Sequence, residues 1–208
     1  MRGIVFIISA PSGTGKTSLV RTLVAQDSNL VISISHTTRA PRPGETNDIH
    51  YHFVSNENFE MLQQSGAFLE HATVYGHAYG TSLEGVENHL ANGKDVILEI
   101  DWQGAQSIRA KLPAVGIYIL PPSREVLAER LTHRKQDQAA VIDKRMKQAS
   151  QEMAHFHEYE YVVINDEFET ALSDIQSIIH AARLTRERQE VRYHTLIKGL
   201  VDAPLPRP

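Results

Sequence analysis

No cysteine occurs among the 208 residues of the sequence. This absence excludes disulfide bonds, thiol nucleophiles and thiolate metal sites, so any chemistry must use oxygen and nitrogen groups. A chain without cysteine is compatible with a reducing compartment, and we expect a cytoplasmic protein.

The sequence also lacks a hydrophobic run long enough to span a membrane. Its apolar N-terminal run, Ile4–Ile8, is too short for a span or for the core of a signal peptide. A glycine-rich loop follows this run where a signal peptide would have a cleavage site. We therefore expect no membrane partner, and we predict that the run forms a buried strand.

A strong excess of one charge is missing as well. The formal net charge is -4, and 22% of the residues are charged. A protein that coats nucleic acid needs a basic surface, so we expect no nucleic-acid partner. Because 41% of the residues are hydrophobic, the chain can bury one compact core. An anionic ligand must then be met by a local cluster of cations.

Short apolar runs rich in β-branched residues recur along the chain. They lie at Ile4–Ser9, Val96–Ile100, Gly116–Leu120 and Tyr161–Asn165. Helical patterns separate or follow them, at 17–26, 103–111, 123–132, 139–158 and 167–189. Strands that alternate with helices predict right-handed crossovers and an α/β fold around a parallel sheet.

Three other segments depart from this pattern. Between Val31 and Tyr79, apolar and polar residues alternate, which predicts a small mixed or antiparallel insertion with one wetted face. The polar stretch Thr132–Ala140 lies between two helical patterns and is predicted to be a mobile cap. For the last residues, 186–208, we predict a helix that frays into a disordered tail.

The loop after the first run, "SAPSGTGKTSL", has the Walker A arrangement. Its backbone N–H groups can surround phosphate oxygens, Lys16 can charge-pair with the β- and γ-phosphates, and the Thr17 hydroxyl can bind Mg²⁺. A nucleoside triphosphate is the expected ligand, and a plain strand-to-helix turn is the alternative. Ala10 replaces the first glycine of the motif, which requires a negative φ there. The expected ATP-binding loop consists of Ala10, Pro11, Ser12, Gly13, Thr14, Gly15, Lys16 and Thr17.

Two acids, Glu99 and Asp101, follow the run "VIL" two residues apart and are expected on one face of a strand end. A carboxylate at such a position can hold the water shell of a metal ion. Surface carboxylates that only solubilise the strand end are the alternative. The spacing leaves open which acid is nearer the metal.

A second candidate anion site is "SHTTRAPRPGE". Pro41 and Pro43 favour a polyproline II path, on which Arg39 and Arg42 would project from the same side and clamp a phosphate dianion. A solvated basic loop is the alternative. The tyrosine hydroxyls of "HYHF" and "AYGTS" could donate to the same phosphate.

Six segments, "APSGTGKTSL", "SHTTRAPRPGE", "YGTS", "LEIDWQGAQ", "LPPS" and "VIND", occur in this order, and together they resemble guanylate kinases of the bacterial kind. The resemblance runs from about Ile4 to about Arg183. It implies one domain, 1–208, with a P-loop nucleoside monophosphate kinase fold: a parallel core sheet with helices on both faces, a small mixed-β GMP-binding subdomain and a helical lid. The implied divisions are a core of 1–32, 91–125 and 150–190, a GMP-binding subdomain at 33–90, a lid at 126–149 and a tail at 184–208.

The family reaction converts MgATP and GMP, or dGMP, into ADP and GDP or dGDP. By resemblance, Arg39, Arg42, Tyr51 and Tyr79 hold the GMP phosphate, and Ser35, Glu70 and Thr81 read the base. The implied GMP site also includes Glu45, Glu99 and Asp101. Asn165 is expected beside the adenine. The implied catalytic cations are Lys16, Arg39, Arg130, Arg134 and Arg145.

Guanine presents N1–H and N2–H₂ donors side by side, which one ionised carboxylate can accept together, whereas adenine would place a lone pair against it. An inactive phosphopeptide-binding module of the same fold is a second hypothesis. Modules of that kind have lost the phosphate loop that this chain keeps. A kinase for another phosphate ester is a third, and the guanine-reading set argues against it. The sequence does not distinguish a monomer from a homo-oligomer.

Overall fold

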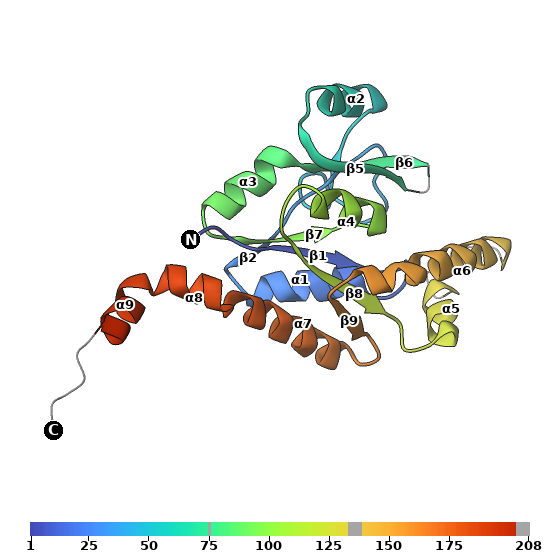
Figure 1. Ribbon diagram of the computed structural model, residues 1–208. Helices are drawn as coiled ribbons and strands as arrows, with labels where there is room; N and C mark the ends of the chain where they lie inside the picture. The colour runs from blue at the N-terminus through green and yellow to red at the C-terminus, as the bar shows by residue number, and fades with distance from the viewer. Residues whose placement is uncertain (75, 133–138, 203–208) are drawn as a thin grey trace.

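The computed structural model describes residues 1–74, 76–132 and 139–202, and its main sheet is parallel throughout (Figure 1). In spatial order, this sheet consists of β2 (Leu30–Ile32), β7 (Asp95–Glu99), β1 (Val5–Ser9), β8 (Val115–Leu120) and β9 (Tyr161–Ile164). The predicted parallel α/β core is confirmed.

The central strand β1 is buried on both faces because its side chains alternate between two hydrophobic clusters. Phe6 and Ile8 pack with α1 (Lys16–Gln26) and α7 (Phe168–Arg183). On the other face, Val5 and Ile7 share a cluster with side chains of α3 (Leu83–Ala91) and α4 (Trp102–Arg109). Helices on both faces therefore hold the end of β1, and the loop that follows it, in a fixed position (Figure 1).

A second sheet forms the upper part of Figure 1. Its order is β4 (His52–Phe53), β3 (His36–Thr37), β6 (His77–Ser82) and β5 (Phe68–Val74), with β3 and β4 parallel and the other pairs antiparallel. The predicted mixed insertion is therefore confirmed. Helix α2 (Asn56–Gln64) packs on it through Phe59, whose ring lies 4.7 Å from that of Phe68.

Two details of this region differ from the prediction. Val31 and Ile32, with which the alternating segment begins, pair with β7 in the main sheet rather than in the insertion. Helices α2 and α3 were not predicted, although each begins after a serine whose side chain accepts the backbone N–H of the third residue of the helix.

The helical arm at the right of Figure 1 consists of α5 (Arg124–Thr132) and α6 (Ala139–Met153). They pack through a small cluster of their own that contains Leu127, Leu131 and Ala149. The predicted helix 139–158 is α-helical only to Met153 and continues as a 3₁₀ turn, η1 (Ala154–Glu158). Most of the predicted mobile cap, residues 133–138, lies outside the described residues.

The C-terminal prediction was wrong in one respect. The expected single helix 167–189 breaks after α7, and a new helix, α8 (Arg186–Arg192), follows its cap Thr185, whose carbonyl accepts from the Gln189 N–H. The chain then stays helical through α9 (His194–Asp202), and the end of the predicted tail, residues 203–208, lies outside the described residues. Within the described residues, none of these helices has the length and apolar character that a membrane crossing needs.

Arg183, the last residue of α7, joins this helix to the main sheet. Its guanidinium lies 2.7 Å from a carboxylate oxygen of Asp95, which is 2% exposed, and 2.7 Å from one of Asp27. The other Asp95 oxygen accepts the Ile4 N–H at 2.7 Å. The first residue of β7 is thus held both by α7 and by Ile4, the residue before β1.

Arg183→Ala should lower the free energy of unfolding by about 3 kcal/mol, because it leaves the buried Asp95 carboxylate without its counter-charge. Asp27→Asn should cost less than about 1 kcal/mol, since that partner is 31% exposed. Urea unfolding of both variants measures the difference, and equal losses would contradict the account.

Candidate active site

A cavity of about 280 Å³ lies where the phosphate loop after β1 faces the small sheet. The carboxyl end of β7 and α6 also contribute to its wall. The predicted residues that line it are Ala10, Pro11, Ser12, Gly13, Thr14, Gly15, Lys16, Thr17, Ser35, Arg42, Tyr51, Glu70, Tyr79, Glu99 and Asp101. Residues from distant parts of the chain therefore share one cavity.

Other predicted residues contact this wall without lining the cavity. They are Arg39, Glu45, Thr81, Arg130 and Asn165, each hydrogen-bonded to a lining residue. The sequence analysis assigned no role to five further lining residues, Ser18, Ala72, Val74, Ile100 and Glu152, although Ser18 and Ile100 lie within its motifs. The place of Ala72, Val74 and Glu152 depends on how β5 and α6 pack, which spacing does not encode.

The phosphate loop adopts the backbone that its glycines allow. Gly13 and Gly15 have φ values of 91° and 93°, a region that other residues rarely adopt. A Cβ at Gly13 would lie 2.9 Å from Leu131, and one at Gly15 would lie 2.6 Å from the Asn165 side chain. Ala10 is not among the residues of the described chain that have a positive φ, so it has the negative φ that was predicted.

Glu99 contacts both the Lys16 ammonium and the Thr17 hydroxyl of the phosphate loop. One of its carboxylate oxygens accepts from the Thr17 hydroxyl at 2.5 Å and lies 3.2 Å from the Lys16 ammonium. Asp101 instead caps α4 by accepting the Gly104 N–H at 2.9 Å. Of the two acids, Glu99 is thus the one beside Thr17. A hydroxyl and a carboxylate side by side are hard oxygen donors of the kind that Mg²⁺ prefers.

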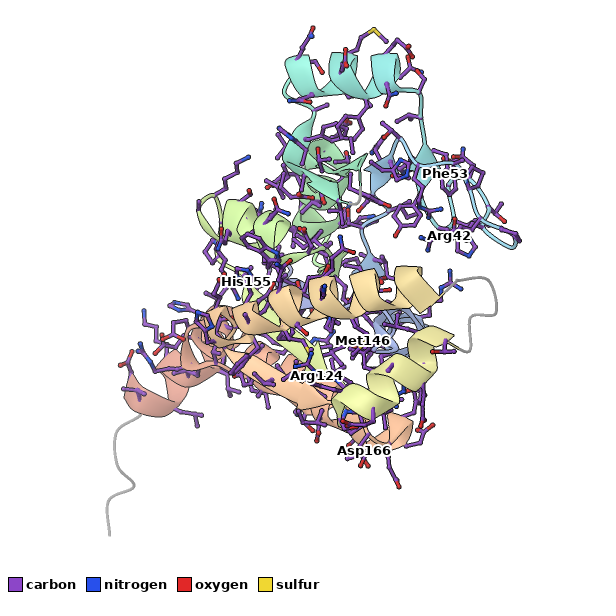
Figure 2. All side chains as sticks on the ribbon, turned by 90° about the vertical axis from the view of Figure 1, so that its right-hand side faces the viewer. Arg42, Phe53, Arg124, Met146, His155 and Asp166 are labelled. Atoms are coloured by element: carbon purple, nitrogen blue, oxygen red, sulfur yellow. The ribbon has the colours of Figure 1, made fainter. Side chains whose placement is uncertain are left out.

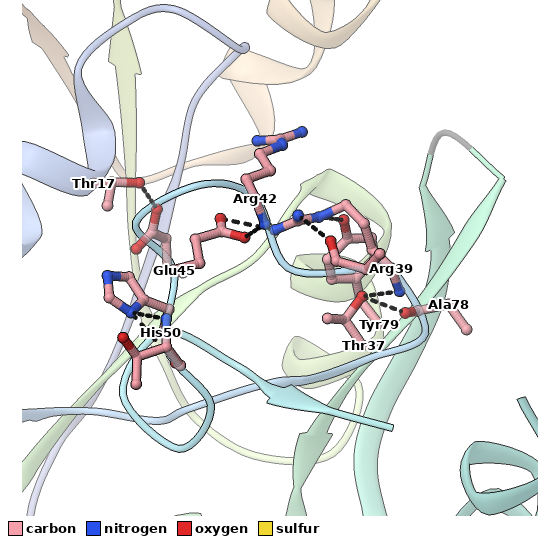
Figure 3. A network of polar contacts seen from close by, with 11 residues as sticks. Thr17, Thr37, Arg39, Arg42, Glu45, His50, Ala78 and Tyr79 are labelled. Carbon is pink, nitrogen blue, oxygen red and sulfur yellow. Dashed lines mark hydrogen bonds and ion pairs between the residues drawn. The ribbon is translucent and has the colours of Figure 1, made fainter. Parts of the chain in front are cut away.

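Arg39 and Arg42 differ in their surroundings (Figure 3). The buried Arg39 guanidinium donates to Glu45 at 2.9 Å, to the Tyr79 hydroxyl at 3.3 Å and to the Ala40 carbonyl. Arg42 uses its backbone N–H to contact Glu45, while its side chain extends away from this network and lines the cavity. The predicted pair therefore does not present two equivalent guanidinium groups in this structure.

The charge balance of this network keeps Arg39 ionised. Burial works against its charge, but Glu45 and Tyr79 outweigh that effect and raise the pKa of Arg39. Burial also disfavours the Glu45 carboxylate, yet the Arg42 N–H and the Arg39 guanidinium lower its pKa overall. Burial raises the pKa of Tyr51 to about 12, so its hydroxyl remains a hydrogen-bond donor.

Glu70, on β5, is 4% exposed, although the sequence suggested a half-exposed strand. The Thr81 hydroxyl donates to one of its carboxylate oxygens at 2.5 Å. Burial raises the pKa of Glu70 to about 7, opposed by the Thr81 hydroxyl and supported by the nearby charge of Asp101. A buried acid of this kind gains most from a ligand that brings hydrogen-bond donors to it.

Behind the phosphate loop, Arg130 and Asn165 hold the Thr14 carbonyl. The Asn165 side chain donates to it at 2.6 Å, and the Arg130 guanidinium donates to it at 3.5 Å and to the Asn165 carbonyl at 3.1 Å. Helix α5 thus contacts the loop directly. Arg134 lies outside the described residues, and so does the side chain of Arg145, a residue of α6.

Seen from the side, Arg42 lies in the loop between β3 and β4, on the side of the small sheet that faces α6 (Figure 2). Three features together define a P-loop nucleoside monophosphate kinase. The parallel sheet has a phosphate loop after its central strand, the part of the chain around the mixed sheet supplies an arginine and a buried acid to the same cavity, and a helical arm lies beside them.

Comparisons with known proteins agree. The family model described as guanylate kinase matches residues 2–182, and on this basis the chain belongs to the guanylate kinase family. The guanylate kinase of Saccharophagus degradans is 52% identical over 96% of this chain and 98% of its own length. That of Nitrosococcus oceani is 51% identical over 97% of this chain and 100% of its own. A crystal structure of guanylate kinase from Anaplasma phagocytophilum superposes with a TM-score of 0.74, at 32% identity, covering 92% of this chain and 96% of that one.

The raised pKa of Glu70 has a consequence for stability. Below its usual pKa of 4.5, the carboxyl is protonated in both the folded and the unfolded chain. As the pH rises toward about 7, the unfolded chain has released this proton and the folded chain has not, so folding stability falls.

We expect the free energy of unfolding to fall by roughly 2 to 3 kcal/mol more in the native chain than in Glu70→Gln between pH 5 and pH 8. Urea unfolding across this range measures the two profiles. Parallel profiles would show that Glu70 does not titrate in this way.

Proposed function

We propose that this chain transfers the γ-phosphoryl group of ATP to GMP, and to dGMP, forming ADP and GDP or dGDP. The observation that carries the proposal is the single cavity lined by Lys16 and Thr17 on one side and by Arg42 and Glu70 on the other. The names of the relatives support it. The alternative of an inactive binding module lacks support, because the phosphate loop keeps Gly15, Lys16 and Thr17 and lies in the cavity.

On the donor side, the backbone of residues 10–15 would surround the ATP phosphates, and the positive end of α1 would face them. Thr17 would bind Mg²⁺, with Glu99 beside it. When bound, this ion supplies positive charge to the phosphate oxygens. Lys16 would leave Glu99 for the transferred phosphoryl group, and Asn165 would lie near the adenine.

On the acceptor side, Arg42 and the hydroxyls of Tyr51 and Tyr79 would bind the GMP phosphate from the cavity wall. Arg39 would add positive charge from behind these side chains, because it donates to the Tyr79 hydroxyl and is held by Glu45. A rigid arginine loses little conformational freedom when the phosphate arrives, which favours binding.

Glu70 would read the guanine base through its N1–H and N2–H₂ donors, with Ser35 nearby and Thr81 fixing the carboxylate. Adenine offers a lone pair where guanine offers a proton, so it would leave the buried carboxylate unpaired. Asp101 adds negative charge close to Glu70 and would favour the same donors.

Transfer itself requires alignment and neutralisation of charge, and the phosphate of GMP is already an anion, so no general base is needed. Arg130 would move from the Thr14 and Asn165 carbonyls toward the phosphoryl group, together with Arg134 and Arg145. Closure would also exclude water. The chain would be divided accordingly into a core, a GMP-binding subdomain at 33–90 and a lid at 126–149. A cytoplasmic location stays a prediction.

An ADP-release assay with ATP tests the reaction directly when GMP, dGMP, AMP, CMP, UMP and no acceptor are offered in turn. GMP and dGMP should support turnover far above the others. Turnover with AMP equal to that with GMP would refute the assignment.

In the same assay with GMP, Lys16→Met should lower kcat by at least about 100-fold with an unchanged melting temperature, because the lysine neutralises the charge that develops on the transferred phosphoryl group.

Arg42→Ala should raise the KM for GMP by roughly 10-fold to 100-fold, the effect of losing a charge-assisted hydrogen bond, and leave the KM for ATP nearly unchanged. Arg186→Ala is the matched control, because Arg186 is exposed on α8 and pairs with Glu187 and Glu190. Separate titrations of the two nucleotides measure the effect. An equal rise in the KM for GMP and in the KM for ATP would contradict a specific role of Arg42 in binding GMP.

A further inference from the structure

Gly104 lies in the first turn of α4, directly against the carboxylate of Glu70. A Cβ built on Gly104 would lie 2.9 Å from Oε2 of Glu70, 3.3 Å from its Cδ and 3.2 Å from Cβ of Ile100. The first of these distances is shorter than carbon–oxygen contacts allow, so one of the two groups would have to move. The lack of a side chain at this position is what lets the carboxylate lie where it does.

The backbone of Gly104 does not itself require glycine, because its φ is not among the positive values of the described chain. Glycine inside a helix is less favourable than alanine. Gly85 provides a comparison, since it occupies the same position of α3 and also donates its N–H to the capping side chain, that of Ser82. A Cβ there would meet Ser82 at 3.4 Å, an ordinary contact.

Glu70 has little freedom to avoid a new side chain. Its Oε1 is held by the Thr81 hydroxyl at 2.5 Å, and the residue is 4% exposed. Asp101, the cap of α4, repels it electrostatically. A displaced carboxylate would therefore lose the Thr81 bond, approach another negative charge or enter the cavity.

We propose that Gly104 is a positioning residue for base recognition. Because Gly104 has no Cβ, Oε2 of Glu70 can lie where it meets the hydrogen-bond donors of the acceptor base. The proposal rests on the function proposed above, in which Glu70 reads guanine. Gly104 touches no substrate and acts through Glu70 alone.

Gly104→Ala should lower kcat/KM for GMP by roughly 10-fold to 100-fold, mainly through KM, as expected when a binding group shifts by a fraction of an ångström to one ångström. The preference for GMP over AMP should fall with it, and the KM for ATP should stay within about twofold. Gly85→Ala, the matched control, should change none of these values. A normal KM for GMP in Gly104→Ala would overturn the proposal.

A double-mutant cycle separates this proposal from the one on which it rests. In a Glu70→Ala background, Gly104→Ala should change the KM for GMP by less than about twofold, because the displaced group is absent. A loss that persists in that background would overturn the proposal by assigning the effect to Ile100 or to α4 itself. If Glu70→Ala alone leaves the KM for GMP unchanged, the role of Glu70 fails instead.

Folding gives a second measurement of the same contact. If Gly104→Ala does not fold, the double variant with Glu70→Ala should fold, with a melting temperature close to that of Glu70→Ala alone. Failure of both variants to fold would overturn the proposal, since the conflict would then lie with Ile100.

Discussion

Two carboxylates hold two cations of this site in place before any substrate arrives. Glu99 contacts Lys16, and Glu45 contacts Arg39. Cations gathered around one cavity repel each other, and long side chains lose conformational entropy when they are fixed. Pairing these two cations with acids reduces both costs, and it helps a chain with a net charge of -4 to prepare a site for two phosphate groups.

The two pairs differ in what they leave for a ligand. Glu99 lies on the cavity wall with Lys16, so a phosphate and its counter-ion would compete for contacts that the acid now makes. Glu45 supports Arg39 from behind the wall and also fixes the backbone of Arg42, so it can keep both contacts when the cavity fills. One acid is exchanged for a ligand, and the other remains part of the support.

Local patterns in the sequence were sufficient for the core of the fold. The phosphate loop and the buried strand before it depend on neighbouring residues, and both appear where they were predicted. The unequal roles of Arg39 and Arg42 could not be predicted, because Tyr79, which holds one of them, lies on β6 and reaches it only through the pairing of β3 with β6. The burial of Glu70 likewise depends on α4, which packs against β5. The sites assigned by resemblance remain predictions about ligands, and the structure adds the contacts that would support them.

The order of the main sheet constrains how the small sheet can move. The chain leaves the core after β2 and returns through α3 to β7, and these two strands are neighbours. A body attached at two adjacent points can swivel about the line between them, but it cannot easily slide along the sheet. Glu70, however, lies against Gly104 of the core helix α4, whereas Arg42 lies in the loop between β3 and β4. A swivel would therefore move Arg42 relative to a base contact that stays with the core, and the turn of the small sheet would set the distance between the phosphate and base contacts.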